Sequence, residues 1–303
     1  APPVVTLLME IERTLDRCER DMNKAASDIA ERLPGRRSIL FAHGVEVVPI
    51  KTATLPPADH TNCYLVGDPE GDFVLVDPAV RMREDMEALA TAVERHRGNL
   101  IAVVFTHSHS DHLADMSLLR EAFDVPVWGS EYTSRSVPCQ RILVDGEDLK
   151  LGRQTWKVLI TPGHHPGHVC LFSGAGLVAG DMVAGIGTIL IPPHTGDMNE
   201  YISQLKRLKG LKPHLVFPSH GPVVAIPDRL MEHYITHRLA RHERVLNAVR
   251  EGTGRLEDIA THAYADTPDA HPGLALDQTL SHLLALEASG KVKHHQSAWH
   301  MEE

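Results

Sequence analysis

One short stretch limits what this chain can fold into more than any other. Residues 106–112 read THSHSDH, which places three histidines and one aspartate within six consecutive positions. They follow the apolar run 100–105, whose β-branched residues and polar flanks predict a buried strand. Residues 113–123 have apolar side chains at helical spacing. The cluster therefore lies in a strand-to-helix loop, where a rigid scaffold can orient side chains.

The residue types in this loop are those that bind divalent metal ions. His107 and His109 are two positions apart, so an extended backbone points both side chains the same way and lets them share one ion. Asp111 and His112 follow where the loop turns into the helix, and can bind a second ion. Neutral imidazole and carboxylate ligands suit borderline ions such as Zn²⁺. A polar loop without a metal is the alternative, because the chain contains 21 histidines.

Three further motifs follow the histidine-rich loop. They are residues 161–168 (TPGHHPGH), 179–181 (AGD) and 219–222 (SHGP). Together with the His-x-His-x-Asp-His loop, they resemble the metal-binding motifs of the metallo-β-lactamase superfamily. The resemblance covers roughly residues 45–225, and four motifs in the right order are far more specific than one.

The resemblance implies an α/β fold, an αββα sandwich whose site for two divalent metal ions opens at one edge. In the implied site His168 completes the first metal site, Asp181 bridges both metals, and His220 belongs to the second. Zn²⁺ is the expected ion, with Mn²⁺ or iron as alternatives. The implied metal ligands are His107, His109, Asp111, His112, His168, Asp181 and His220.

The implied chemistry is hydrolysis by a metal-bound hydroxide. Two ions about 3.5–4 Å apart lower the pKa of a water that they share. Asp111 is the expected catalytic residue, because it would orient this nucleophile and carry its proton. The favoured substrate is a small ester, thioester or related acyl compound, as in the glyoxalase-II-like branch. Two alternatives stay open: a single-strand RNA endonuclease of the β-lactamase-like protein 2 type, and a non-catalytic binding protein with the same fold.

Composition bears on partners and location. The net charge of −10 argues against a chain that grips nucleic acid by charge, and residues 233–303 carry 7 Lys and Arg against 10 Asp and Glu. Nucleic acid is therefore not the favoured partner. No stretch approaches the roughly 20 apolar residues of a membrane span, and residues 1–3 do not begin a secretory signal. Four cysteines without a C-x-x-C pair are expected to be free thiols, so a cytoplasmic location is expected.

The sequence predicts three segments. Residues 1–44 form an N-terminal extension, in which an apolar stripe at steps of three and four predicts one amphipathic helix over 5–31. This helix packs either on the body of the chain or on its copy in a homodimer. Residues 45–226 form the catalytic domain. Residues 227–303 are expected to form three helices and a small hairpin, which resemble the winged-helix tail of the β-lactamase-like protein 2 group and are expected to shape the pocket.

Within these segments, hydrophobic periodicity predicts the individual elements. Strands are expected at residues 45–50, 62–66, 73–77, 100–105, 125–128, 141–144, 156–160, 168–172, 177–180 and 215–218. Helices are expected at residues 83–96, 113–123, 200–208, 231–250, 256–264 and 276–289.

A few polar residues outside the implied ligand set are candidates for supporting roles. Asp77, which ends a predicted strand before Pro78, either orients a ligand histidine or simply belongs to the turn. His165 stands where the resembling motif usually has Thr or Ser, and is a candidate hydrogen-bond donor near the pocket. His60 and His194 are candidates for substrate contact.

Overall fold

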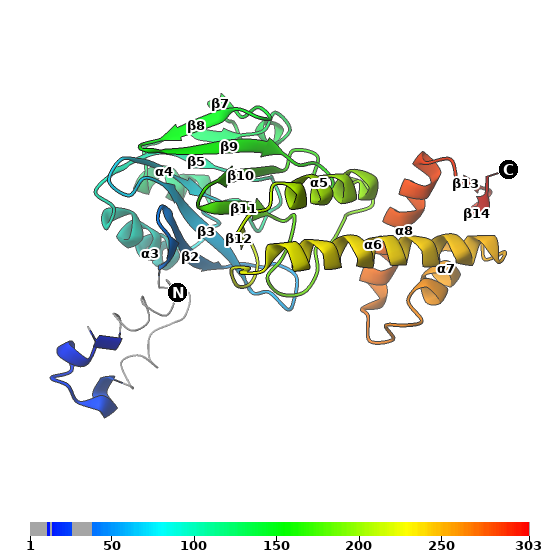
Figure 1. Ribbon diagram of the computed structural model, residues 1–303, viewed down its shortest axis with the longest axis horizontal. Coiled ribbons are helices and arrows are strands. Elements are labelled where there is room, and N and C mark those ends of the chain that lie inside the picture. The colour runs from blue at the N-terminus through cyan, green and yellow to red at the C-terminus, as the bar shows by residue number, and fades with distance from the viewer. Residues whose placement is uncertain (1–10, 13, 26–37, 303) are drawn as a thin grey trace.

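A seven-stranded sheet forms one half of the molecule (Figure 1). The computed structural model describes residues 11–12, 14–25 and 38–302 of the 303-residue chain. The first four strands pair antiparallel, and the remaining neighbours pair parallel. In sheet order, the strands are β1 (Ile39–Ala42), β2 (Val45–Lys51), β3 (His60–Gly67), β4 (Asp72–Val76), β5 (Asn99–Val104), β6 (Val127–Gly129) and β7 (Arg141–Ile142).

A second, five-stranded sheet packs against the first. Its β11 and β12 pair parallel, whereas its other neighbours pair antiparallel. In sheet order, the strands are β12 (Val216–Pro218), β11 (Gly176–Gly180), β10 (Val169–Ser173), β9 (Gln154–Ile160) and β8 (Asp148–Leu151). Between the sheets lies an apolar core, to which the first sheet contributes Tyr64 and Val104, and the second contributes Trp156 and Phe217.

Helices cover the outer faces of both sheets and complete the expected αββα sandwich (Figure 1). On the first sheet lie α3 (Arg83–Glu94) and α4 (Met116–Ala122), whose Leu89 and Leu119 share a core with strand residues. On the second sheet lies α5 (Met198–Gly210), which packs with α6 (Pro227–Arg250). A 3-10 turn, η2 (Thr133–Arg135), precedes β7. In the part of the chain that the structure describes, no helix is both long and apolar enough to cross a membrane.

The C-terminal segment continues from α6, whose second half extends beyond the sandwich (Figure 1). It contains α7 (Leu256–Ala263), α8 (Pro272–Ala288) and a hairpin of β13 (Val292–His295) and β14 (Ala298–Met301). These elements share a core of their own with the end of α6. The buried Arg241 joins them: it donates hydrogen bonds to the carbonyl oxygen of Ala263 and, at 2.8 Å, to Asp266, while its guanidinium lies 4.0 Å from the ring centroid of Tyr264. The expected order of three helices and a hairpin is present.

The N-terminal stripe does not form the single helix that its spacing predicts. Helical turns occur before residue 18 and again over residues 22–25, but Glu19 and Arg20 have φ angles of 52° and 60°. Left-handed backbone at two successive positions ends a right-handed helix. The rest of the stripe, in residues 1–10 and 26–37, lies outside the described residues.

Candidate metal centre

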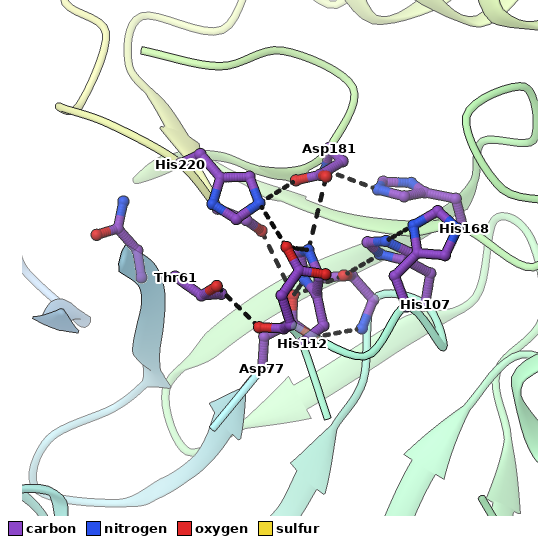
Figure 2. A network of polar contacts seen from close by, with 12 residues as sticks. Thr61, Asp77, His107, His112, His168, Asp181 and His220 are labelled. Atoms are coloured by element: carbon purple, nitrogen blue, oxygen red, sulfur yellow. Dashed lines mark hydrogen bonds and ion pairs between the residues drawn. The ribbon is translucent and has the colours of Figure 1, made fainter. Parts of the chain in front are cut away.

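The polar cluster forms where loops from both sheets meet at one edge of the sandwich (Figure 2). Residues 105–115 connect β5 to α4, and residues 161–168 connect β9 to β10. Asp181 follows β11, and His220 follows β12. A hydrogen bond of 2.8 Å from the backbone nitrogen of Asn62 to the carbonyl oxygen of Ser219 joins the two sheets here. Residues far apart in sequence therefore meet on a well-supported edge.

Three imidazole rings form one half of the cluster. The Nδ1 atom of His109 lies 2.9 Å from the Nε2 atoms of both His107 and His164, which are 3.3 Å from each other. The Nδ1 atom of His164 donates to the carbonyl oxygen of Leu190 at 2.7 Å. The Nδ1 atom of His107 donates to the Thr106 hydroxyl at 3.0 Å, because that hydroxyl gives its own proton to Asp77. Both neutral rings therefore direct Nε2 lone pairs into the cluster.

This arrangement suits a bound cation. Lone pairs that converge within hydrogen-bond distance repel one another unless a proton or a metal ion lies between them. Two nitrogens bound to a tetrahedral Zn²⁺ at 2.0–2.1 Å lie about 3.3 Å apart, close to the separations observed here. The donor set is therefore compatible with a divalent ion held by three imidazoles.

Two carboxylates and two further imidazoles form the other half. The Nε2 atom of His220 lies 3.4 Å from Oδ2 of Asp111 and 3.4 Å from Oδ1 of Asp181. The Nε2 atom of His112 lies 3.6 Å from Oδ2 of Asp181, which is also 3.5 Å from Nε2 of His164. Asp181 thus lies between the two halves. Among the described residues, neither Nε2 of His112 nor Oδ1 of Asp181 has a hydrogen-bond partner, although both are buried. A second cation would satisfy both atoms.

Asp77 supports the cluster from below (Figure 2). Its carboxylate accepts hydrogen bonds from the Thr106 backbone nitrogen at 2.7 Å and hydroxyl at 2.6 Å, and from Nδ1 of His112 at 2.9 Å. The bond to His112 fixes the tautomer that directs Nε2 into the site. Asp77 has a φ of 49°, a left-handed conformation that is uncommon outside glycine. Of the two roles open to Asp77, the observed contacts are those of an orienting carboxylate.

His168 does not join the donor cluster, in contrast to what the sequence motif implied. Its Nδ1 atom is hydrogen-bonded to the Thr161 hydroxyl at 2.8 Å, and its Nε2 atom accepts from the Asp181 backbone nitrogen at 2.9 Å. Both ring nitrogens are therefore used inside the protein. The side chain of His168 instead holds the turn that presents Asp181. A Cβ atom at Gly180 would lie only 2.3 Å from Nε2 of His168, so this packing needs a glycine.

His164 was not among the expected ligands, although its motif contains it. The difference lies in the backbone. His168 directly precedes β10, and its carbonyl oxygen accepts from the Thr161 nitrogen at 2.9 Å, which fixes its direction in the sheet. His164 lies in the loop, where its ring can reach the other imidazoles. The strand predicted over residues 168–172 was the signal that could have favoured His164. A strand fixes the direction of the His168 side chain, whereas a loop residue such as His164 is free of that constraint.

Of the three other candidate histidines, His165 and His60 contact residues of the cluster or its loops. His165 accepts from the Gly167 nitrogen through Nδ1 at 3.1 Å, so its Nε2 donates to the Ser108 hydroxyl at 3.0 Å. It is thus a hydrogen-bond donor beside the histidine loop, as expected. His60 contributes its carbonyl oxygen, which accepts from Nδ1 of His220 at 2.9 Å, while its ring bonds Asp59 at 2.6 Å. His194 is an exposed residue of the loop before α5.

The two halves differ in electrostatics. Burial lowers the pKa of His109 to about 4, and burial together with neighbouring imidazoles holds the pKa of His107 well below its ordinary value. Burial also acts on His220, but the charges of Asp181 and Asp111 outweigh it and raise that pKa to about 10. The pKa of His112 is raised well above its ordinary value for the same reason, through Asp181 and Asp77. The carboxylates of this half therefore stabilise a bound proton or cation.

A family profile decides what kind of protein this is. The profile described as the metallo-beta-lactamase superfamily matches residues 56–136 and 130–220, which is more than half of the chain. The chain belongs to the metallo-β-lactamase superfamily. It is accordingly a metal-dependent hydrolase.

Several proteins of this superfamily are similar to the chain over most of its length. A Beta-lactamase-like protein 2 homolog of Drosophila melanogaster is 27% identical over 255 residues, which cover 78% of this chain and 86% of that protein. An Atrochrysone carboxyl ACP thioesterase of Aspergillus fumigatus is 26% identical over 193 residues, or 63% of this chain and 60% of that protein. The crystal structure of a Beta-lactamase domain protein from Burkholderia ambifaria has the same fold, with a TM-score of 0.74 at 24% identity, over 90% of this chain and 96% of that one.

The metal centre lies at the base of a cavity of about 500 Å³. Two loops form most of its walls: residues 53–58, between β2 and β3, and residues 184–192, between β11 and α5. Leu274 and Gln278 of α8 complete the lining. The C-terminal segment therefore shapes the pocket, as the sequence suggested. Of the described residues that line this cavity, none is a lysine or an arginine.

Proposed function

We propose that this hydrolase uses two divalent metal ions, with Zn²⁺ as the expected ion, to cleave a small carboxylic ester or thioester. One observation carries the proposal: two groups of side chains that could hold a metal ion lie on either side of Asp181 at the base of an apolar cavity. The first group is His107, His109 and His164. The second group is Asp111, His112 and His220. His164 takes the place that the sequence motif suggested for His168.

The ions, when bound, supply Lewis acidity and a hydroxide nucleophile at neutral pH. The residues of the chain do the rest. Asp181 keeps the two groups at a fixed separation, and Asp77 keeps His112 in the tautomer that binds. Asp111 lies on the cavity side of the cluster with 18% of its side chain exposed, so its carboxylate can orient the attacking water and take up its proton.

The cavity favours a carboxylic substrate over a phosphodiester. An RNA strand carries one negative charge per nucleotide, and proteins that bind it use basic grooves and stacking aromatic side chains. The cavity lining, as far as the chain is described, offers neither Lys, Arg nor an aromatic ring other than histidine. Apolar walls instead suit the acyl part of an ester. The thioesterase name of one relative agrees with this choice.

A hydrolysis screen tests the proposal. Protein purified without chelator would be offered acyl thioesters, aryl esters, lactones, bis(p-nitrophenyl) phosphate and single-stranded RNA, with His107→Ala as the inactive control. We expect thioester or ester cleavage that disappears in His107→Ala and close to two metal equivalents per chain. RNA cleavage that exceeds ester cleavage would replace the proposed substrate class. Activity that persists after complete removal of metal would refute the mechanism.

A further inference from the structure

The cavity wall formed by residues 184–192 has an unusual form of support. This loop lies outside both sheets, and side chains from three helices hold its backbone. Tyr201 of α5 donates to the carbonyl oxygen of Met182 at 2.9 Å. Tyr234 of α6 accepts from the Ala184 nitrogen at 3.2 Å and donates to the carbonyl oxygen of Gly187 at 3.3 Å. The start of the loop is therefore fixed by two buried tyrosines.

The end of the loop is fixed by polar side chains of α6 and α8. The buried Arg238 donates to the carbonyl oxygen of Ile189 and, at 2.8 Å, to the amide oxygen of Gln278. Gln278 in turn donates to the carbonyl oxygen of Ile191 at 2.8 Å, and the Ser281 hydroxyl donates to the same oxygen at 2.7 Å. The C-terminal helices thus determine where this wall lies.

The opposite wall meets this loop directly. Gly187 has a φ of 73°, and a Cβ atom there would lie 2.9 Å from Cδ of Pro57. Three apolar side chains that line the cavity are partly exposed: Leu55 is 50%, Ile186 44% and Leu274 36% exposed. Large apolar side chains gathered around the opening of a pocket usually indicate that a ligand covers them. Since the cavity leads to the metal centre, its occupant is the substrate.

We infer that the substrate carries an aliphatic acyl chain, and that Leu274 and Gln278 of α8 set the length that is accepted. The inference rests on the function proposed above, because it places the ester carbon at the metal centre. The chain then runs between the walls formed by residues 53–58 and 184–192. Residues of α8 complete the lining on the side of the C-terminal segment. A chain long enough to reach them buries its methylene groups against Ile186 and Leu274.

A ladder of straight-chain acyl thioesters, from acetyl to dodecanoyl, tests the inference on the metal-loaded enzyme. Each buried methylene contributes about 0.8 kcal/mol, so kcat/KM should rise about fourfold per methylene until the chain reaches α8. Leu274→Trp fills that end of the cavity. We expect it to lower the ratio of dodecanoyl to acetyl kcat/KM by at least about tenfold, the scale of a few lost methylene contacts.

Leu239→Trp is the matched control, because Leu239 is a leucine of α6 with similar exposure (45%) that does not line the cavity. It should leave the ratio unchanged. Leu274→Ala is a second variant that removes rather than adds volume, and should extend the rise to longer chains. Thermal melting and metal content establish that each variant is folded and loaded.

The outcomes separate this inference from the proposed function. If thioesters are cleaved but the rate does not depend on chain length, or if Leu274→Trp behaves as Leu239→Trp, the acyl-chain assignment is wrong while the hydrolase proposal survives. If no ester or thioester is cleaved although two metal ions are bound, the proposed function itself fails.

Discussion

The two halves of the candidate metal centre both contain histidines, but the pKa values of these histidines are shifted in opposite directions. In the half formed by His107, His109 and His164, burial keeps the imidazoles neutral, and their pKa values are lowered. In the other half, carboxylates surround His112 and His220 and raise their pKa values. Without metal, the first half is therefore a set of free lone pairs, whereas the second holds protons where a cation would bind.

This difference shows how one cluster can bind two ions unequally. A metal ion entering the imidazole half displaces few protons, because the rings are already deprotonated at neutral pH. An ion entering the carboxylate half must displace protons from His112 and His220, but gains the charge of Asp111 and Asp181. Affinity in the second half should therefore depend far more strongly on pH.

Removing the residue that the halves share should have the largest effect. Asp181→Ala deletes the carboxylate that lies between His112, His164 and His220. We expect ester hydrolysis to fall by about 10³-fold or more, the scale of a lost metal-activated nucleophile and its proton transfer, with metal lost from both halves. Steady-state kinetics and metal analysis check this. His165→Ala is the control, since it removes only the bonds to Ser108 and the Gly167 nitrogen, and equal losses in both variants with metal retained would show that Asp181 does not bridge.

The imidazole half can be broken separately. His164→Ala should leave about one metal equivalent instead of two, and should reduce activity by more than the roughly 10–100-fold that loss of an orienting partner costs. His168→Ala should keep both metal ions more nearly intact and act mainly by loosening the Asp181 turn. Metal titration of the two variants side by side decides between them. If His168→Ala loses the metal and His164→Ala does not, the interpretation taken from the sequence motif is restored.

In the carboxylate half, Asp77 is the residue that orients His112. Asp77→Asn keeps the shape of the side chain but removes the charge that holds the proton on Nδ1 of His112. We expect about 10–100-fold weaker binding of the metal ion that His112 would hold, and a smaller loss in the imidazole half, which Asp77 reaches only through the Thr106 hydroxyl beside His107. Competition with a chromophoric chelator measures both affinities. Equal weakening of the two sites would mean that the halves are coupled more tightly than their geometry indicates.

A change far from the metals should affect the imidazole half alone. Arg238→Met removes the hydrogen bond to Ile189, next to Leu190, whose carbonyl oxygen fixes Nδ1 of His164. Leaving buried oxygens unpaired should lower the free energy of unfolding by about 1–3 kcal/mol and weaken metal binding in that half. Denaturant unfolding and metal titration measure both effects. Arg244→Met, at an exposed position of α6, is the control.

The pH dependence gives the smallest but most direct comparison. In metal-free protein, the pKa of His109 falls from 6.5 to about 4, so the unfolded state takes up protons first and stability decreases as pH falls from 6.5 toward 4. The pKa of His220 rises to about 10, so its contribution is complete below 6.5 and is lost as pH rises toward 10. Thermal melts across this range should therefore show the highest melting temperature near pH 6.5, where the two windows meet.

The same difference between the halves should appear in the number of protons that each metal ion releases when it binds. At neutral pH one binding step should release protons from His112 and His220, and the other almost none. Calorimetric titration in buffers of different ionisation enthalpy separates the steps, and hydrolysis should decline below about pH 6 as protons compete for the carboxylate half. Two steps with the same proton release would remove the distinction between the halves.

Much of this architecture could be predicted from the sequence, because its determinants are local. The apolar run before His107 and the four motifs specify strands that end in polar loops, and those loops meet where expected. The edge strands β1 and β8 were missed, since a pattern only four residues long does not stand out from its surroundings. The choice between His164 and His168 depended on backbone direction at a strand end, which spacing alone does not reveal.

Contacts between residues far apart in the chain could not be predicted either, because local spacing does not reveal them. The run 186–192 was visible as an apolar stretch, but its role depends on Arg238 and Gln278, which lie about 50 to 90 residues further along the chain. Equally, the interruption of the N-terminal stripe at Glu19 and Arg20 is a matter of two backbone angles that the apolar spacing does not encode.

The way the loop 184–192 is held has a consequence for how such an enzyme can change over generations. The proposed metal ligands all lie before residue 221, whereas the side chains that fix this cavity wall are spread over α5, α6 and α8. Mutations of lining residues of α8 such as Leu274 can therefore alter which molecules are accepted, without changing the proposed metal ligands or the hydrogen bonds that orient them. Evolution can thus change substrate selection through one part of the gene, while the part that encodes the proposed metal ligands stays unchanged.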